Sequence, residues 1–235
     1  YHENKLERGF QKLINIWGAD HHGYVGRMKA AIKALGYSED VFEVVIGQMV
    51  NLLRAGEPVR MSKRTGEMVT LEELLDEVGK DALRFLFLMR GTNSALDFDI
   101  ELAKKQSSEN PVYYVQYAHA RICSIIKFAR EKGFLLESID KVGLSSLKEA
   151  AELDLIRKLA EFEDLVERAA LMRAPHIFTE YLQDLGSLFH VFYTKCRVIG
   201  EDENLSKARL FLSDCTRLVL KKGLSLIGVE APESM

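Results

Sequence analysis

The stretch NPVYYVQYAHAR, residues 110–121, decides the fold of the second half of this 235-residue chain. Its first residue, an asparagine, is a type that caps helices, and the proline after it suits the first helical position. Spacings of three and four residues place Tyr114, Tyr117 and Arg121 on one face of the predicted helix. Such a face can be a stacking platform for unpaired bases, at ~1 to 3 kcal/mol per base. From spacing alone, half-buried core tyrosines with hydroxyls reaching solvent are the more common arrangement.

Apolar residues continue this helical periodicity on both sides of the stretch. Spacings of three and four predict helices over 81–90, 110–132, 144–172, 176–199 and 204–227, separated by breaks marked by Gly, Asp or Pro. Thr70, followed by Glu73, is expected to form a capping box for a helix that begins near Leu71. The sequence therefore predicts an all-α bundle of about four long helices after a linker helix.

The first part of the chain has a different pattern. A short apolar run predicts a strand at 13–17, helical spacing follows over 25–35, and 42–53 form a second extended run. Strand, helix and strand make a βαβ crossover in a mostly parallel sheet. The predicted fold is mixed, with a remnant of a Rossmann-type α/β domain followed by the all-α bundle. The expected domains are 1–75, 76–110 and 111–235.

Composition restricts the classes of protein that fit. A formal net charge of −3 does not indicate a nucleic-acid partner, so RNA binding would depend on local placement of cations and aromatic rings. The three cysteines are too far apart for a zinc or redox pair and fit a reduced, cytoplasmic compartment. No apolar run predicts a membrane span, and no signal peptide is evident. Because the chain begins at Tyr1 without an initiator methionine, a preceding portion is expected to be missing.

Residues 60–66, RMSKRTG, concentrate cations in a loop after a predicted strand. The loop resembles the KMSKS signature of class I aminoacyl-tRNA synthetases, which Met61, Ser62 and Lys63 match in register, with arginines at the first and last positions. Amino-acid activation expels pyrophosphate, whose developing charge must be met by mobile cations. The resemblance implies that Arg60, Met61, Ser62 and Lys63 form this catalytic loop, with Lys63 the principal cation. A solvated basic turn is the alternative for so short a motif.

A second motif, WGADHHGY at 17–24, lies at the carboxyl end of a predicted parallel strand, where open α/β sheets bind ligands. It resembles a segment of arginyl-tRNA synthetases, which implies that Gly18, Asp20, His21 and Gly23 bind ATP. Gly18 would allow close approach of the nucleotide, Asp20 would accept from ribose hydroxyls, and His21 would lie beside the adenosine. Turn-forming histidines are one alternative. Metal ligation is another, but consecutive residues rarely converge on one ion, so no protein-bound metal site is expected.

The bundle carries further resemblances to the same family. Residues 81–84 read DALR, the sequence that names the helical anticodon-binding domain of arginyl- and cysteinyl-type synthetases. Asp81 and Arg84 are expected to pair locally, because they lie three apart on a helix. The stretch 110–121 resembles the first long helix of the arginyl-tRNA synthetase bundle, which implies tRNA contacts for the Tyr114, Tyr117 and Arg121 face.

Two segments near the end of the chain also resemble this family. Residues 188–198 resemble another bundle helix, whose aromatic residues are expected in the core. Residues 228–235 resemble the short terminus that lies beside the anticodon, so Met235 is a candidate base contact. A frayed tail is the alternative.

The resemblance implies an arginine–tRNA ligase that activates arginine with ATP, with Mg²⁺ as the counter-ion of ATP, and transfers it to tRNA-Arg. A monomer without membrane contact is expected, with the arginine pocket mostly before Tyr1. The chain has no H-x-G-H signature, so by itself it is expected to be inactive. A related class I synthetase of cysteinyl type and a non-enzymatic tRNA-binding module are the alternatives.

Overall fold

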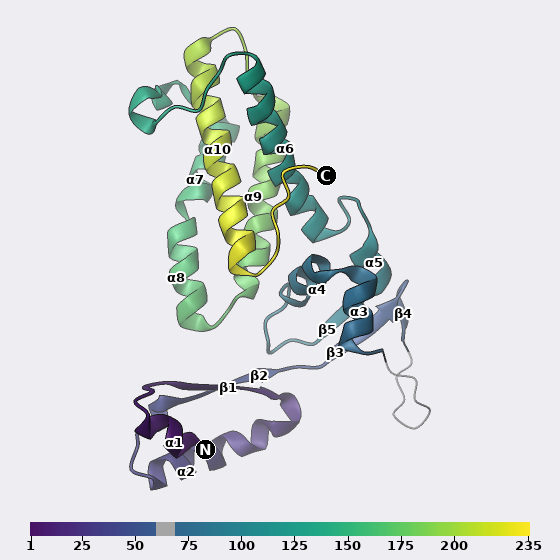
Figure 1. Ribbon diagram of the computed structural model, residues 1–235, viewed down its shortest axis with the longest axis vertical. Helices are drawn as coiled ribbons and strands as arrows, with labels where there is room; N and C mark the ends of the chain where they lie inside the picture. Colours follow the sequence, from purple (N-terminus) through teal and green to yellow (C-terminus); the bar gives the residue numbers. More distant parts are fainter. Residues whose placement is uncertain (60–68) are drawn as a thin grey trace. The chain divides into compact units, whose positions relative to one another are not determined.

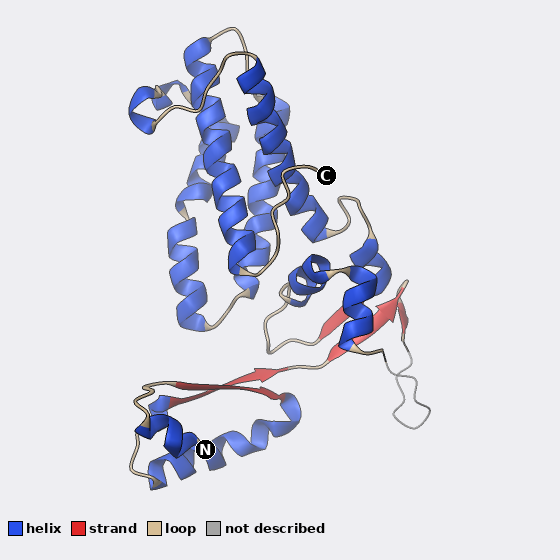
Figure 2. Cartoon of the chain, in the orientation of Figure 1, coloured by secondary structure: helices blue, strands red, loops and turns tan. Residues whose placement is uncertain are grey.

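The computed structural model describes residues 1–59 and 69–235 (Figure 1). The described residues form two compact units, of which the first consists of residues 1–59 and 90–98 and the second of the remainder. Figure 2 shows the change along the chain from mixed strand and helix to an all-helical bundle. This change confirms the predicted mixed fold class. None of the helices in the described part of the chain is long and apolar enough to cross a membrane.

The first unit is built on the predicted strand, helix and strand. β1 (Leu13–Gly18) and β2 (Phe42–Gly47) pair in parallel, with Leu13 opposite Phe42 and Gly18 opposite Gly47. Leu6, Leu13, Ile32 and Phe42 form the buried core under these strands. The βαβ prediction is therefore confirmed. The other elements around this pair are α1 (His2–Glu7), η1 (Ala19–Tyr24), α2 (Val25–Ala34) and η2 (Glu39–Val41).

The extended run at 42–53 is two strands in different sheets. β2 ends at Gly47, and β3 (Val50–Arg54) lies between β4 (Glu57–Pro58) and β5 (Leu96–Asp99) in a separate three-stranded sheet. Between them the backbone N–H of Gln48 donates to the carbonyl oxygen of Thr92, 2.9 Å away. The prediction of one strand is wrong, because a continuous apolar run does not reveal where the chain changes its pairing partner.

The second unit begins with three short helices. The capping box at the first of them is confirmed, since Thr70 Oγ1 accepts from Glu73 N–H at 3.1 Å and Glu73 Oε2 accepts from Thr70 N–H at 2.8 Å. Asn110 precedes the first long helix, but its side chain does not cap it. The amide instead donates to the carbonyl oxygens of Ala103 and Lys105, both at 2.9 Å, and ties the helix to the preceding turn. The short helices are α3 (Leu71–Val78), α4 (Lys80–Phe87) and α5 (Ile100–Lys104).

The long helices pack around a fully buried apolar core that includes Leu182, Phe189 and Phe192. Gly223 permits the close approach of the last helix, because a Cβ there would lie 2.7 Å from Leu182 Cδ2. The predicted helix over 144–172 is broken, since residues 144–146 form a 3-10 turn and a capping box at Glu149 starts the α-helix. The elements are α6 (Pro111–Glu131), η3 (Ile139–Lys141), η4 (Leu144–Ser146), α7 (Ala150–Ala160), α8 (Phe162–Met172), α9 (His176–Lys195) and α10 (Glu203–Leu226).

Candidate nucleic-acid interface

A planar cation bridges two helices of the bundle. Arg121 on α6 lies over the ring of Tyr193 on α9, with its guanidinium carbon 4.4 Å from the ring centroid. The same guanidinium lies 5.6 Å from the ring centroid of Tyr117 and donates a hydrogen bond to its hydroxyl. A hydrogen bond with Tyr193 raises the pKa of Arg121. Two tyrosines and one arginine thus form a cluster at the surface of the helical unit.

Tyr114 has a different environment from Tyr117, although both were expected on one face. Its ring is tilted against His190 of α9 at a centroid distance of 5.0 Å, and it faces Gly186 of the same helix. Burial, followed by the nearby Arg121 charge, lowers the pKa of His190. The structure therefore places Tyr114 between α6 and α9, behind the cluster.

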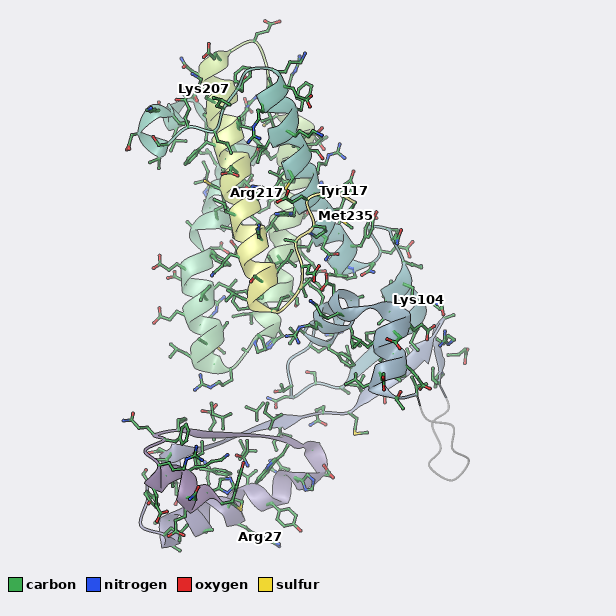
Figure 3. The ribbon with its side chains drawn as sticks, viewed as in Figure 1. Arg27, Lys104, Tyr117, Lys207, Arg217 and Met235 are labelled. Atoms are coloured by element: carbon green, nitrogen blue, oxygen red, sulfur yellow. The ribbon has the colours of Figure 1, made fainter. Side chains whose placement is uncertain are left out.

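The cluster lines a groove of about 380 Å³. Met235 and the ring of Phe128 are half exposed there, at 52% and 50% of their surfaces. Tyr117 and Tyr193 are each 36% exposed. Rings, a thioether and one guanidinium therefore face solvent together, and Figure 3 shows Tyr117 and Met235 close to each other at this site. The lining residues are Tyr117, Ala120, Arg121, Ser124, Ile125, Phe128, Tyr193, Ser234 and Met235.

One wall of the groove comes from residues 227–235, here called the tail. The tail is bound by the motif at 81–84, since Arg84 Nε donates to the carbonyl oxygen of Ile227 at 2.9 Å. The carboxylate of Asp81 accepts from the backbone N–H of Glu230 at 3.2 Å. The expected local pair between Asp81 and Arg84 is therefore wrong. Both side chains bind the backbone of a segment about 150 residues away in sequence, which helical spacing cannot show.

Two residues of α6 bind the tail as well. Gln116 Nε2 donates to Asp81 Oδ2 at 2.8 Å and to the carbonyl oxygen of Glu230 at 2.9 Å. His119 is fully buried, and its Nδ1 lies 2.8 Å from the carbonyl oxygen of Pro232. A carbonyl can only accept, so Nδ1 carries the proton and donates. These hydrogen bonds hold the tail against the helices, so it is not frayed, which was the alternative from the sequence.

A second hollow adjoins the groove, because Ser124 and Ser234 line both. Lys127 and Arg130 of α6 and Arg217 of α10 line this basic hollow together with Glu233 of the tail. Arg217 is paired with Asp214 at 2.7 Å, so the surplus of positive charge is smaller than three cations suggest. The net charge of the chain does not reveal this local surplus.

The motif at 17–24 lies at the carboxyl end of β1 in the first unit, as expected. A Cβ on Gly18 would lie 2.6 Å from Asp20 Oδ1, so a side chain at this position would displace the carboxylate. Asp20 and His21 are exposed and lie 3.5 Å apart, from Oδ2 to Nε2. A Cβ on Gly23 would contact no other atom within 4 Å, so packing does not explain glycine there. The catalytic-loop residues Arg60, Met61, Ser62 and Lys63 lie outside the described residues.

The helical part of the chain matches a known family of RNA-reading domains. Residues 115–235 match the family model of the DALR anticodon binding domain. The chain belongs to the DALR anticodon-binding domain family. Over its whole length it is 55% identical to an arginine–tRNA ligase of Carboxydothermus hydrogenoformans, of which it spans 42%. The resemblance to arginyl-tRNA synthetases is thereby confirmed along the chain.

Solved structures agree with this DALR assignment. A Campylobacter jejuni protein provisionally assigned as an arginyl-tRNA synthetase superposes on the whole chain with a TM-score of 0.89 and 38% identity. The match covers 50% of that protein. Arginyl-tRNA synthetase of Thermus thermophilus matches 96% of the chain with a TM-score of 0.75 and 25% identity, over 41% of its own length. The chain therefore spans about half the length of the relatives it matches, or less.

Sequence reasoning missed one member of the DALR-domain groove. Tyr193 lies in the segment 188–198, whose aromatic residues were all expected in the core. Phe189 and Phe192 are fully buried as expected, but Tyr193 is one position farther around α9 and reaches the surface beside Arg121. The expectation treated the aromatic residues of the segment as one group, and the sequence does not show that α6 brings Arg121 against Tyr193.

Proposed function

We propose that the chain provides the tRNA-reading part of an arginine–tRNA ligase, and that the whole protein joins arginine to tRNA-Arg using ATP. The observation that carries the proposal is the groove in which Tyr117, Arg121 and Tyr193 meet Met235 on a DALR domain. The name of the relatives, arginine–tRNA ligase, supports arginine as the amino acid.

The groove suits unpaired bases of an anticodon loop. Splayed bases stack on aromatic rings and on guanidinium planes, and Tyr117, Phe128, Tyr193 and Arg121 offer both kinds of surface. Arg121 is already held over the Tyr193 ring and hydrogen-bonded to Tyr117, so little side-chain freedom would be lost when a base binds. Tyr114 would act from behind, by supporting His190 and through it Tyr117.

Phosphates of the same loop would lie in the basic hollow. Lys127 and Arg130 line a hollow that adjoins the aromatic groove, which suits an RNA chain whose bases and phosphates point to different sides. Cations at this position make binding depend on salt, because neutralised phosphates release their counter-ions.

The first unit would contribute to ATP binding. Asp20 and His21 are exposed at the carboxyl end of β1, where Gly18 and Gly47 lie side by side without side chains. This arrangement leaves room for a nucleotide and offers carboxylate acceptors for ribose hydroxyls. ATP, with Mg²⁺, would supply the adenylyl group, and Lys63 would meet the charge that develops on the departing pyrophosphate.

The test is exchange between ATP and labelled pyrophosphate by the complete protein. The proposal predicts exchange that requires arginine and that is greatly stimulated by tRNA-Arg. Exchange that requires cysteine or another amino acid would overturn the assignment to arginine. Binding of tRNA-Arg without exchange under any of these conditions would instead favour a tRNA-binding module.

A further inference from the structure

Most of the hydrogen bonds that hold the tail go to its backbone. Side chains of Asp81, Arg84, Gln116 and His119 contact the carbonyl oxygen of Ile227, the N–H and carbonyl oxygen of Glu230, and the carbonyl oxygen of Pro232. Bonds to the backbone fix the path of a segment, whatever side chains it carries. These four side chains are here called the tail clamp.

The clamp reaches almost to the groove. Its last contact is at Pro232, and Ser234 and Met235 line the groove two and three residues later. Consecutive Cα atoms are about 3.8 Å apart. If the contact between His119 and the carbonyl oxygen of Pro232 were lost, Ser234 and Met235 could therefore move by several ångströms. None of the four clamp residues is among those that line the groove.

The start of the tail is adapted to the clamp as well. Gly228 has a φ of +71°, a conformation that favours glycine. A Cβ at Gly228 would lie 2.6 Å from Arg84 Nε, so glycine also permits the arginine to reach the carbonyl oxygen of Ile227. Ile227 and Val229 on either side are buried, which anchors this turn against the bundle.

We propose that Asp81, Arg84, Gln116 and His119 are positioning residues for RNA recognition, because they hold the tail in the place where it completes the groove. The inference rests on the proposed function of the groove. By this inference, Asp81 and Arg84 of the DALR motif affect anticodon binding indirectly. They hold the tail and do not contact RNA. The alternative is that the clamp contributes to the stability of the fold and not to RNA affinity.

The test compares Gln116→Leu in the full chain and in a chain that lacks residues 229–235. Leucine keeps most of the volume of Gln116 but loses both donated hydrogen bonds. In the full chain we expect affinity for tRNA-Arg to fall about tenfold, in line with the loss of two partly buried hydrogen bonds. In the shortened chain the same substitution should change affinity by less than about twofold, because Ser234 and Met235, the tail residues that line the groove, are absent.

A matched control is Lys80→Ala, which removes an exposed ion pair between Lys80 and Glu230 of the same tail. The affinity of Lys80→Ala for tRNA-Arg should stay within about twofold of that of the wild type. Hydrogen exchange provides a readout that a general loss of stability would not reproduce. In Gln116→Leu, the amides of Val229, Glu230, Ala231 and Glu233 should exchange faster while amides of α9 keep their protection. Equal acceleration in both segments would overturn the positioning role.

Failure of this inference and failure of the proposed function have different signatures. If wild-type chain binds tRNA-Arg and Gln116→Leu binds equally well, the clamp has no positioning role, while the proposed function stands. An equal loss in the full and shortened chains would also overturn the inference, since Gln116 would then act without the tail. If the wild-type chain does not bind tRNA-Arg, the proposed function fails, and this inference fails with it.

Discussion

Replacing Arg121 with glutamine removes the cation that joins α6 to α9 at the groove. The lost contact with the Tyr193 ring contributes ~0.5–1 kcal/mol at an exposed site, and the lost hydrogen bond to Tyr117 contributes about 1 kcal/mol. We therefore expect the free energy of unfolding to fall by about 1–2 kcal/mol, which leaves a folded protein for binding measurements. Binding of RNA is a separate quantity. The loss of one stacking partner should weaken the free energy of binding by ~1–3 kcal/mol, which raises Kd about 5- to 150-fold.

The assay is titration of a fluorescent anticodon stem-loop of tRNA-Arg with the full chain at fixed salt. Arg121→Lys separates charge from shape, because lysine keeps the charge but not the planar guanidinium, and its affinity should lie between those of the other two proteins. Arg157→Gln is the control for loss of an exposed arginine, since Arg157 lies on α7 and pairs locally with Asp154. Binding by Arg121→Gln within twofold of the wild type would refute the role of the cluster.

Three further predictions concern buried or strained positions. Glu152→Ala removes the fully buried partner of Arg209, 2.6 Å away. Urea unfolding should show that the free energy of unfolding falls by ~3–5 kcal/mol. A fall of less than about 1 kcal/mol would contradict a tightly held pair. Burial lowers the pKa of His119 from its ordinary 6.5, so the unfolded chain binds the proton more readily and stability falls as pH drops below about 6.5. His119→Gln should flatten this part of the stability profile, and an unchanged profile would refute the assignment. Gly228→Ala places a methyl group against Arg84 at positive φ and should lower the melting temperature; an unchanged melting temperature would show that the turn relaxes without cost.

The sequence predicted those features that depend on local pattern. Periodicity located the bundle helices, the capping box at Thr70 and Glu73 was read from three-residue spacing, and the βαβ unit followed from apolar runs. Each of these is determined within a single turn or strand, where propensity and pattern agree. The resemblance of residues 110–121 to a synthetase helix likewise led to the correct family.

The sequence failed where a residue's partner is distant. Asp81 and Arg84 looked like a local pair because their spacing allows one, yet the partners that compete for them lie in the tail. Asn110 looked like a helix cap, but two carbonyl oxygens at the end of α5 take its amide. Tyr193 was expected in the core, yet it stays part exposed and meets Arg121 because α6 packs beside α9. In all three cases tertiary contacts, which no local pattern encodes, decide the outcome.

Whether the groove binds the bases of the anticodon loop can be measured by titrating the full chain with two stem-loops of tRNA-Arg. One carries the natural anticodon loop, and the other has the same stem with the anticodon bases replaced by abasic sites. We expect removal of these bases to weaken binding at least tenfold, since each stacked base contributes ~1–3 kcal/mol. Equal affinity for the two stem-loops would show that the chain holds RNA by its phosphates alone and would contradict base binding in the groove.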